Sequence, residues 1–260
     1  MKKILMTFLL VTVFFGGLSS VNAQVVYIAH RGASYLAPEN TLASEKKAFK
    51  LGADAVECDI QLSKDNRLMV IHDKNTKRVS GQELKIAETD SKELRKLDVG
   101  SFKDKAYKGE KIPFLEETLA NLPKGKNLVI ELKSKTETIP FLKETVLKSG
   151  KLDQLLFIAF DFATIIEAKN TFPENKCYWL SGNKGDLLSK IEDIAGCRLD
   201  GVDLSSKIID EELVSQLKKL DLDIVAYTVD DPVEAKRLID LGVTKITTNR
   251  PAWLKTELEK

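Results

Sequence analysis

The sequence predicts an α/β fold, specifically a TIM (β/α)8 barrel with a small insertion after the second strand. Short apolar runs alternate with amphipathic helical patterns from residue 25 to the end of the 260-residue chain, and this alternation indicates parallel strands joined by helical crossovers. About 240 residues are enough for the eight strand-helix units of a closed barrel. A doubly wound open sheet shows the same alternation, but the glycine-rich phosphate loops typical of it do not occur in the sequence.

Short apolar runs, many of them β-branched, predict the strands. They cover residues 25–29, 55–62, 68–71, 128–132, 155–160, 177–180, 201–204, 224–229 and 245–248. Apolar residues at helical spacing predict the helices between the later strands, as in Leu213, Leu217 and Leu220. Asp231 before Pro232 predicts the start of another helix, and Gly242 predicts its end.

Residues 73–112 interrupt this pattern, because they are polar and rich in Lys and Arg. They contain only scattered hydrophobic residues, such as Leu84, Ile86, Leu94 and Leu97. We interpret the segment as an insertion rather than a linker, so residues 24–260 are expected to form one barrel domain.

Residues 1–23 have the order of a secretory signal peptide. Lys2 and Lys3 precede an apolar run over residues 4–15, and a small-residue cleavage site ends at Ala23. A membrane anchor is the alternative, but the run is shorter than the roughly 20 residues that span a bilayer. We therefore expect export, to a bacterial periplasm or as a secreted protein, and no stable membrane insertion.

The charge of the chain is close to balanced, with 40 Lys and Arg against 39 Asp and Glu. Loss of Lys2 and Lys3 with the signal leaves 38 against 39, a net charge of −1. Neither value provides a field that holds nucleic acid. The expected partner is therefore a small molecule, and the oligomeric state is left open.

The three cysteines suit an oxidising compartment only loosely. Cys58 lies inside a strand pattern and is expected to be buried. Cys177 and Cys197 either pair in a disulfide or remain buried free thiols.

Chemically reactive residues gather at the carboxyl ends of the predicted strands, where the active sites of such barrels are built. His30 and Arg31 follow the first strand and offer a proton-transfer group beside a permanent cation, which suits a phosphate. His72 follows the third strand, beside Asp73. His30 and His72 are the only histidines in the chain, and both stand at strand ends, which suggests an acid/base pair. Asn40 is expected to cap the helix that follows the first strand.

Three carboxylates form the second feature. Glu57 and Asp59 are two residues apart on a strand and therefore share a face. Glu131 lies on the next predicted parallel strand, where it shares a face with Lys133. Carboxylates crowded in a barrel mouth repel each other, and a hard divalent cation removes that cost. The alternative is a set of internal ion pairs with nearby Arg or Lys, including Glu131 with Lys133. Lys133 is also placed to hold a phosphoryl oxygen.

Together these residues favour a displacement reaction at the phosphorus of a phosphodiester. Catalysis of this reaction consists mainly of positioning the reacting groups and neutralising the charge of the phosphate. The chain resembles the glycerophosphodiester phosphodiesterase family in their order and spacing. The matching stretches are His30-Arg31-Gly32, Pro38-Glu39-Asn40-Thr41, Gly52-Ala53-Asp54-Ala55-Val56-Glu57-Cys58-Asp59, Val70-Ile71-His72-Asp73, Ile112-Pro113 with Leu115-Glu116-Glu117, and Glu131-Leu132-Lys133.

The resemblance implies a TIM barrel that hydrolyses glycerophosphodiesters, which are deacylated phospholipids, to glycerol 3-phosphate and an alcohol. It also implies a role for each site residue: His30 and His72 as general acid and base, Glu57, Asp59 and Glu131 as ligands of Ca²⁺ or Mg²⁺, and Arg31 and Lys133 as phosphate-binding residues. Which histidine is the acid, which metal is bound and which alcohol is released are left open.

Four stretches depart from the family pattern. Ala159-Phe160-Asp161 replaces a serine and an acid, Tyr227-Thr228-Val229-Asp230 replaces Trp-Thr-Val-Asn, Thr248-Asn249-Arg250-Pro251 replaces Thr-Asp-Arg-Pro, and Phe114 replaces a threonine. All four are expected to lie outside the metal and proton-transfer residues and to affect only the pocket wall and the alcohol specificity. Asn249 to Pro251 would also suit a cap of the last helix.

Three other functions are compatible with the sequence. The same barrel could act on lysophospholipids or sphingolipids, which would need an apolar rim at its mouth. It could instead bind polyol phosphates without catalysis, although such a protein would be expected to have lost a histidine or a carboxylate. An unrelated sugar or aldol barrel enzyme would not need three carboxylates.

Overall fold

The computed structural model describes residues 24–260. The predicted signal peptide, residues 1–23, lies outside the described residues.

The strands form a nine-stranded sheet in the order β1-β9-β8-β7-β6-β5-β4-β2-β3, and an additional pairing of β1 with β2 closes it. Every pairing is parallel except that of β3 with β2. The eight parallel strands therefore make a closed barrel, which confirms the predicted fold. The strands are β1 (Val26–Ala29), β2 (Ala55–Leu62), β3 (Leu68–Val70), β4 (Asn127–Leu132), β5 (Leu155–Ala159), β6 (Lys176–Ser181), β7 (Gly201–Ser205), β8 (Asp223–Tyr227) and β9 (Lys245–Thr248).

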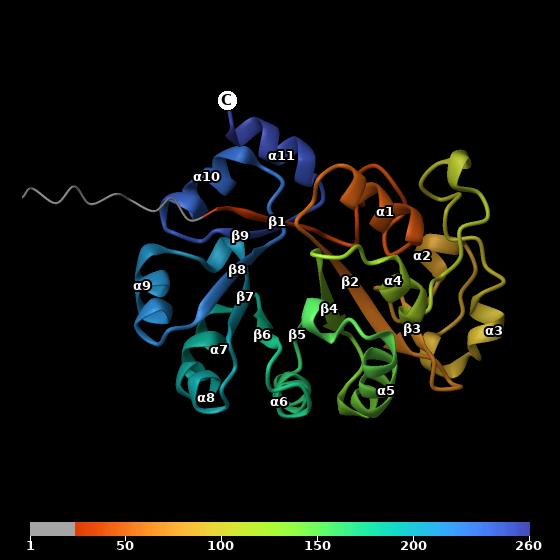
Figure 1. Cartoon of the computed structure of the whole chain (residues 1–260), viewed down its shortest axis with the longest axis horizontal. Helices are drawn as coiled ribbons and strands as arrows, with labels where there is room; N and C mark the ends of the chain where they lie inside the picture. Colours follow the sequence, from red (N-terminus) through yellow and green to blue (C-terminus); the bar gives the residue numbers. More distant parts are fainter. Residues whose placement is uncertain (1–23) are drawn as a thin grey trace, which may run out of the picture.

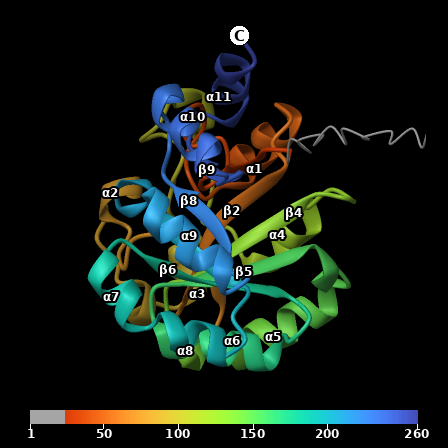
Figure 2. The same cartoon turned by 90° about the vertical axis from the view of Figure 1, so that its left-hand side faces the viewer.

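Helices surround this ring of strands (Figure 1), and α9 lies across the outer face of β8 in the turned view (Figure 2). The outer helices are α1 (Leu42–Lys50), α4 (Leu115–Asn121), α5 (Ile139–Ser149), α6 (Phe162–Thr171), α7 (Lys184–Ser189), α8 (Ile191–Gly196), α9 (Glu211–Lys219), α10 (Pro232–Asp240) and α11 (Pro251–Leu258). Asp231 caps α10 as predicted, because its side chain accepts a hydrogen bond from the Val233 amide. No helix within residues 24–260 is both long and apolar enough to cross a membrane.

The insertion forms a small body beside the barrel, with α2 (Lys77–Ser80) and α3 (Ser91–Leu94) at the right of Figure 1. It begins earlier than the polar segment suggested, because β3 already leaves the barrel by pairing antiparallel with the end of β2. The few hydrophobic residues of the segment are enough for a core of its own, which comprises Met69, Ile71, Val79, Ile86, Leu94, Leu97, Val99 and Ile112.

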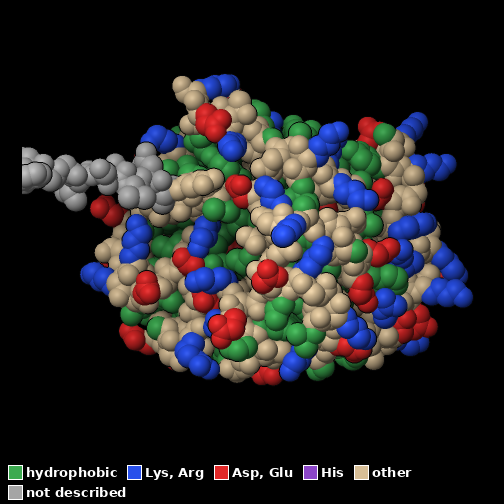
Figure 3. Space-filling view, viewed as in Figure 1, with side chains coloured by type: hydrophobic (Ala, Val, Ile, Leu, Met, Phe, Trp, Pro, Cys, Tyr) green, Lys and Arg blue, Asp and Glu red, His purple; other side chains and the backbone are tan. Residues whose placement is uncertain are grey.

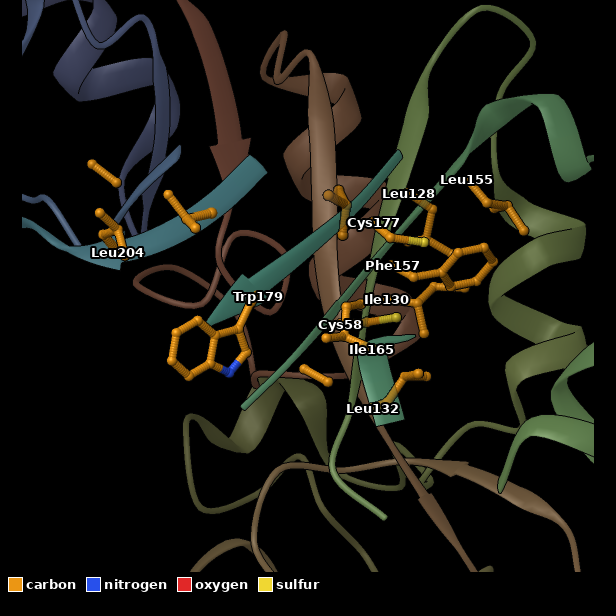
Figure 4. Packing of buried hydrophobic residues seen from close by; sticks show 14 of the residues in the cluster. Cys58, Leu128, Ile130, Leu132, Leu155, Phe157, Ile165, Cys177, Trp179 and Leu204 are labelled. Carbon is orange, nitrogen blue, oxygen red and sulfur yellow. The ribbon is translucent and has the colours of Figure 1, made fainter. Parts of the chain in front are cut away.

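The main core lies between the strands and the outer helices. Figure 4 shows Leu128, Ile130 and Phe157 from the strands packed with Ile165 of α6. Cys58 belongs to this core, which confirms that it is buried. All three cysteines are free, so Cys177 and Cys197 do not form a disulfide in the structure. On the face seen in Figure 3, acidic and basic side chains are interspersed, in keeping with the balanced charge.

We predict that Leu128→Ala lowers the free energy of unfolding by about 2–5 kcal/mol, because Leu128 is 1% exposed and its loss leaves a cavity. The same substitution at Leu147 of α5, which is 55% exposed, should change it by less than about 0.5 kcal/mol. Urea unfolding followed by circular dichroism measures both. Equal losses in the two variants would contradict this description of the core.

Candidate active site

Side chains from most of the barrel strands converge on a cavity of about 180 Å³ at the carboxyl ends of the strands. It is lined by His30, Arg31, Glu57, His72, Glu131, Lys133, Ile158, Phe160, Leu180, Asp203, Tyr227, Thr228 and Thr247. Six of the predicted site residues are in this set, and the seventh, Asp59, lies within the same carboxylate cluster.

Larger hollows at the amino ends of the strands are lined by residues such as Lys176 and Lys245. Both lysines have acidic partners there: Lys245 Nζ lies 2.7 Å from Asp223 Oδ2, and Lys176 Nζ lies 3.5 Å from Asp223 Oδ2 and from Asp200 Oδ1. The chemistry therefore belongs to the smaller cavity, where buried charges are left without partners.

The three carboxylates meet because β2 and β4 are in register. Asp59 lies opposite Glu131 across the parallel pair, and Glu57 is two residues before Asp59 on the same face. One oxygen atom of each carboxylate lies within 4.8 Å of the corresponding atoms of the other two. The structure thus brings together the three acids that were expected to share a site.

Burial and mutual repulsion oppose full ionisation of this cluster. Burial, and then the charges of Asp59 and Glu131, raise the pKa of Glu57 well above its usual value. Burial and the charge of Asp59 likewise raise the pKa of Glu131 to about 7. Glu57 Oε1 and Asp59 Oδ1 are buried without a hydrogen-bond partner. Unpartnered, crowded carboxylate oxygens are a donor set that suits a hard divalent cation.

The alternative of internal ion pairs is also present, but only in part. Arg31 Nε lies 3.2 Å from Asp59 Oδ2, and Lys133 Nζ lies 2.8 Å from Glu131 Oε1. Burial opposes the ionisation of Asp59, yet the charge of Arg31 holds its pKa below the usual value. The two cations therefore restrain Asp59 and Glu131, while Glu57 receives only the backbone N–H of Arg31, at 2.8 Å to Oε2.

A tight turn after β1 aims Arg31 at the cluster. Arg31 and Gly32 both have positive φ angles, of 54° and 81°. A Cβ atom at Gly32 would lie 2.3 Å from Ser44 Oγ, so only glycine fits between the turn and α1. The guanidinium also donates to Glu39 Oε1 at 2.8 Å.

Asn40 does not cap α1, and that expectation was wrong. Thr41 is the cap, with its Oγ1 accepting from the Ser44 amide. Asn40 instead has a φ angle of 55° and donates from Nδ2 to Asp59 Oδ2 at 2.7 Å, while its Oδ1 accepts from the Asp59 amide at 3.1 Å. The short, polar side chain tolerates the left-handed conformation, which frees its amide to orient the carboxylate of Asp59.

His30 is held by a chain of hydrogen bonds that sequence reasoning missed. Its Nδ1 lies 2.8 Å from Asn249 Oδ1, and Asn249 Nδ2 donates to Asp230 Oδ2 at 2.6 Å. Because the carboxylate of Asp230 fixes the amide nitrogen of Asn249, Oδ1 faces His30 and must accept. His30 therefore carries its proton on Nδ1, and Nε2 keeps its lone pair.

His72 is held differently, by charge. Its Nδ1 lies 2.8 Å from Asp73 Oδ1, and Asp73 Oδ2 accepts from Arg78 Nε of the insertion at 2.7 Å. Arg78 also donates to both oxygens of Glu39, at 2.7 and 2.8 Å. The insertion thus braces the loops that carry His72 and Arg31.

The four departures from the family pattern fall in different places. Phe160 and Tyr227 line the cavity wall, as expected. Phe114 does not, because its ring lies under the guanidinium groups of Arg67 and Arg95, 4.0 and 4.7 Å from their Cζ atoms. Asn249 lies in contact with His30, so the expectation that all four stand apart from the proton-transfer residues was also wrong.

Comparisons with known proteins cover nearly the whole chain and agree on one family. Residues 30–253 match the glycerophosphoryl diester phosphodiesterase family. A glycerophosphodiester phosphodiesterase of Caldanaerobacter subterraneus is 32% identical over 238 residues, covering 89% of this chain and 96% of that protein. A Bacillus subtilis enzyme of the same name is 29% identical over 249 residues, covering 88% of this chain and 84% of its own length.

A solved structure agrees with these relatives. An Oleispira antarctica phosphodiesterase in complex with its product sn-glycerol-3-phosphate superposes with a TM-score of 0.85 at 29% identity, covering 90% of this chain and 97% of that one. With the barrel, the carboxylate cluster and the family match in agreement, this chain belongs to the glycerophosphoryl diester phosphodiesterase family.

Proposed function

We propose that this protein is a metal-dependent glycerophosphodiester phosphodiesterase that releases glycerol 3-phosphate and an alcohol from deacylated phospholipids. The observation that carries the proposal is the cavity in which three buried carboxylates, two cations and two histidines meet. The family match and the product bound to the Oleispira relative support the same chemistry. We further propose that residues 1–23 direct export to a periplasm or out of the cell.

Glu57, Asp59 and Glu131 would hold Ca²⁺ or Mg²⁺, because Glu57 Oε1 and Asp59 Oδ1 are buried without a hydrogen-bond donor and an oxygen of Glu131 lies within reach of the other two carboxylates. When bound, the cation would supply positive charge to a phosphate oxygen. Arg31 and Lys133 would bind the remaining phosphate oxygens from the same side of the cavity.

The hydrogen bonds of the two histidines favour different roles. His30 has its Nδ1 proton committed to a neutral amide, so its Nε2 would accept the proton of the nucleophile, either water or the 2-hydroxyl of the substrate. His72 is instead hydrogen-bonded to the carboxylate of Asp73, and it would protonate the leaving alcohol as the P–O bond breaks.

A second candidate function rests on an apolar rim. Tyr35 and Leu36, 54% and 48% exposed, lie in the loop that begins with Arg31, and Lys103 and Tyr107 of the insertion contact the backbone of this loop. Such a rim suits the acyl chain of a lysolipid. Comparing hydrolysis of glycerophosphocholine with that of a lysophosphatidylcholine separates the two functions.

Release of glycerol 3-phosphate from a panel of glycerophosphodiesters is the direct test. We expect activity to disappear with a chelator and to return with Ca²⁺ or Mg²⁺, because the unpartnered carboxylates need the cation. Glu57→Gln should lose metal binding in calorimetry, whereas Glu144→Gln on the exposed face of α5 should not. Full activity after exhaustive chelation would contradict the metal site, and absence of product would leave a binding protein.

His72→Ala is expected to lower kcat by roughly 10²–10⁴-fold, the usual contribution of a positioned acid or base. Lys74→Ala, an exposed neighbour, should leave kcat unchanged. Steady-state kinetics with matched urea unfolding curves would show whether the loss is catalytic. Near-wild-type turnover by His72→Ala would rule out its proposed role.

Exchanging Asp230 and Asn249, as Asp230→Asn with Asn249→Asp, should shift the acid limb of the kcat/KM profile. Burial and then Arg31 lower the pKa of His30 in the native protein, with Asn249, Asp59 and Glu39 opposing them. A carboxylate at position 249 would favour the protonated ring and raise that pKa, so the base would need a higher pH. An unchanged limb, with the plateau rate retained, would mean that His30 is not the base.

A further inference from the structure

One buried carboxyl group in the cavity is not used by the proposed mechanism. Asp203 is the central residue of β7 and is 2% exposed. Its neighbours Val202 and Leu204 belong to the core between the strands and the helices. Because side chains alternate along a strand, Asp203 faces the interior of the barrel, where it lines the same cavity as His30 and Glu131.

Asp203 has nothing to compensate for its burial. Its Oδ1 is buried without a hydrogen-bond partner, and no ion pair involves it within residues 24–260. Burial, and then the charge of Glu131, raise the pKa of Asp203 well above its usual value. A carboxyl oxygen buried in this way keeps its capacity for a hydrogen bond, and leaving that capacity unused is costly.

The strand order places Asp203 opposite the carboxylate cluster. Counting around the closed ring β1-β2-β4-β5-β6-β7-β8-β9, β7 lies four strands from β2 in either direction. Glu57 and Asp59 therefore stand on one wall of the barrel and Asp203 on the wall across from them. Leu180 and Val225 flank Asp203 in register on the adjacent strands, so neither of these neighbours offers it a hydrogen bond.

We propose that Asp203 binds the hydroxyl groups of the glyceryl part of the substrate, with the phosphate held across the cavity by the carboxylate-bound cation, Arg31 and Lys133. This inference rests on the proposed function. The glyceryl end carries two free hydroxyls, each of which can donate a hydrogen bond to the unpartnered oxygen of Asp203. The variable alcohol then points toward the open mouth, where Phe160 is exposed.

Asp203→Leu and Asp203→Asn test the proposal as a matched pair. Asparagine also offers a donor and an acceptor, so Asp203→Asn should keep kcat/KM for glycerophosphocholine and glycerophosphoethanolamine within a few fold. Leucine offers neither, so Asp203→Leu should lower both values by about 10- to 100-fold, chiefly through KM.

Inhibition by the product distinguishes substrate binding by Asp203 from a purely structural role, because a structural role would not affect one inhibitor more than another. Asp203→Leu should weaken inhibition by sn-glycerol 3-phosphate by a similar factor and leave inhibition by inorganic phosphate unchanged. Urea unfolding should show no loss of stability in Asp203→Leu, because the side chain has no internal partner. If that variant does not fold, Asp203→Ala replaces it in the same comparison.

Three results would overturn the proposal. The first is equal affinity of wild type and Asp203→Leu for sn-glycerol 3-phosphate, and the second is an equal loss of inhibition by inorganic phosphate and by sn-glycerol 3-phosphate in Asp203→Leu. The third is a loss of kcat/KM in Asp203→Asn that is confined to substrates with cationic head groups. The last would make Asp203 a counter-ion for the alcohol. Failure of the proposed function is a separate outcome, because it would appear in the wild-type protein as absence of hydrolysis across the panel.

Discussion

The repulsion among Glu57, Asp59 and Glu131 is the constraint on which the rest of the site depends. Strand register forces the three carboxylates together, and burial removes the water that would otherwise screen them. The surrounding contacts offset this repulsion only in part. Arg31 pairs with Asp59 and Lys133 pairs with Glu131, but one oxygen each of Glu57 and Asp59 has no hydrogen-bond partner. This incomplete compensation leaves a cluster of carboxylates that could hold a cation.

Apart from His72, the insertion contributes to the site without lining its cavity. Its Arg78 joins Glu39 and Asp73, and those two acids hold Arg31 and His72 respectively. Burial opposes the ionisation of Glu39, but hydrogen bonds from Arg78 and the charge of Arg31 bring its pKa to about 2. A shared acid, Glu39, therefore links Arg31 to the insertion, so folding of this small body and geometry of the site are coupled.

The fold and the principal site residues could be predicted from the sequence because they follow local periodicity. Alternation within a strand places Glu57 and Asp59 on one face, and the same rule applies to Glu131 and Lys133. The partners of these residues could not be predicted, because they depend on which strands meet when the barrel closes. Asn249 reaches His30 only through the β1–β9 pairing, and Asp203 stands across from β2 only in the closed ring.

The layered interior of the barrel explains why so few polar groups have such strong effects. Below the site, Ile28, Val129, Ile158 and Val225 form an apolar layer, and below that layer Asp223 is neutralised by lysines at the amino ends of the strands. The apolar layer separates the two charged ends and gives the site a floor of low polarity. Charge–charge interactions are stronger in such surroundings. A polar side chain buried there without a partner therefore costs free energy, and a ligand that supplies the missing hydrogen bond recovers that cost.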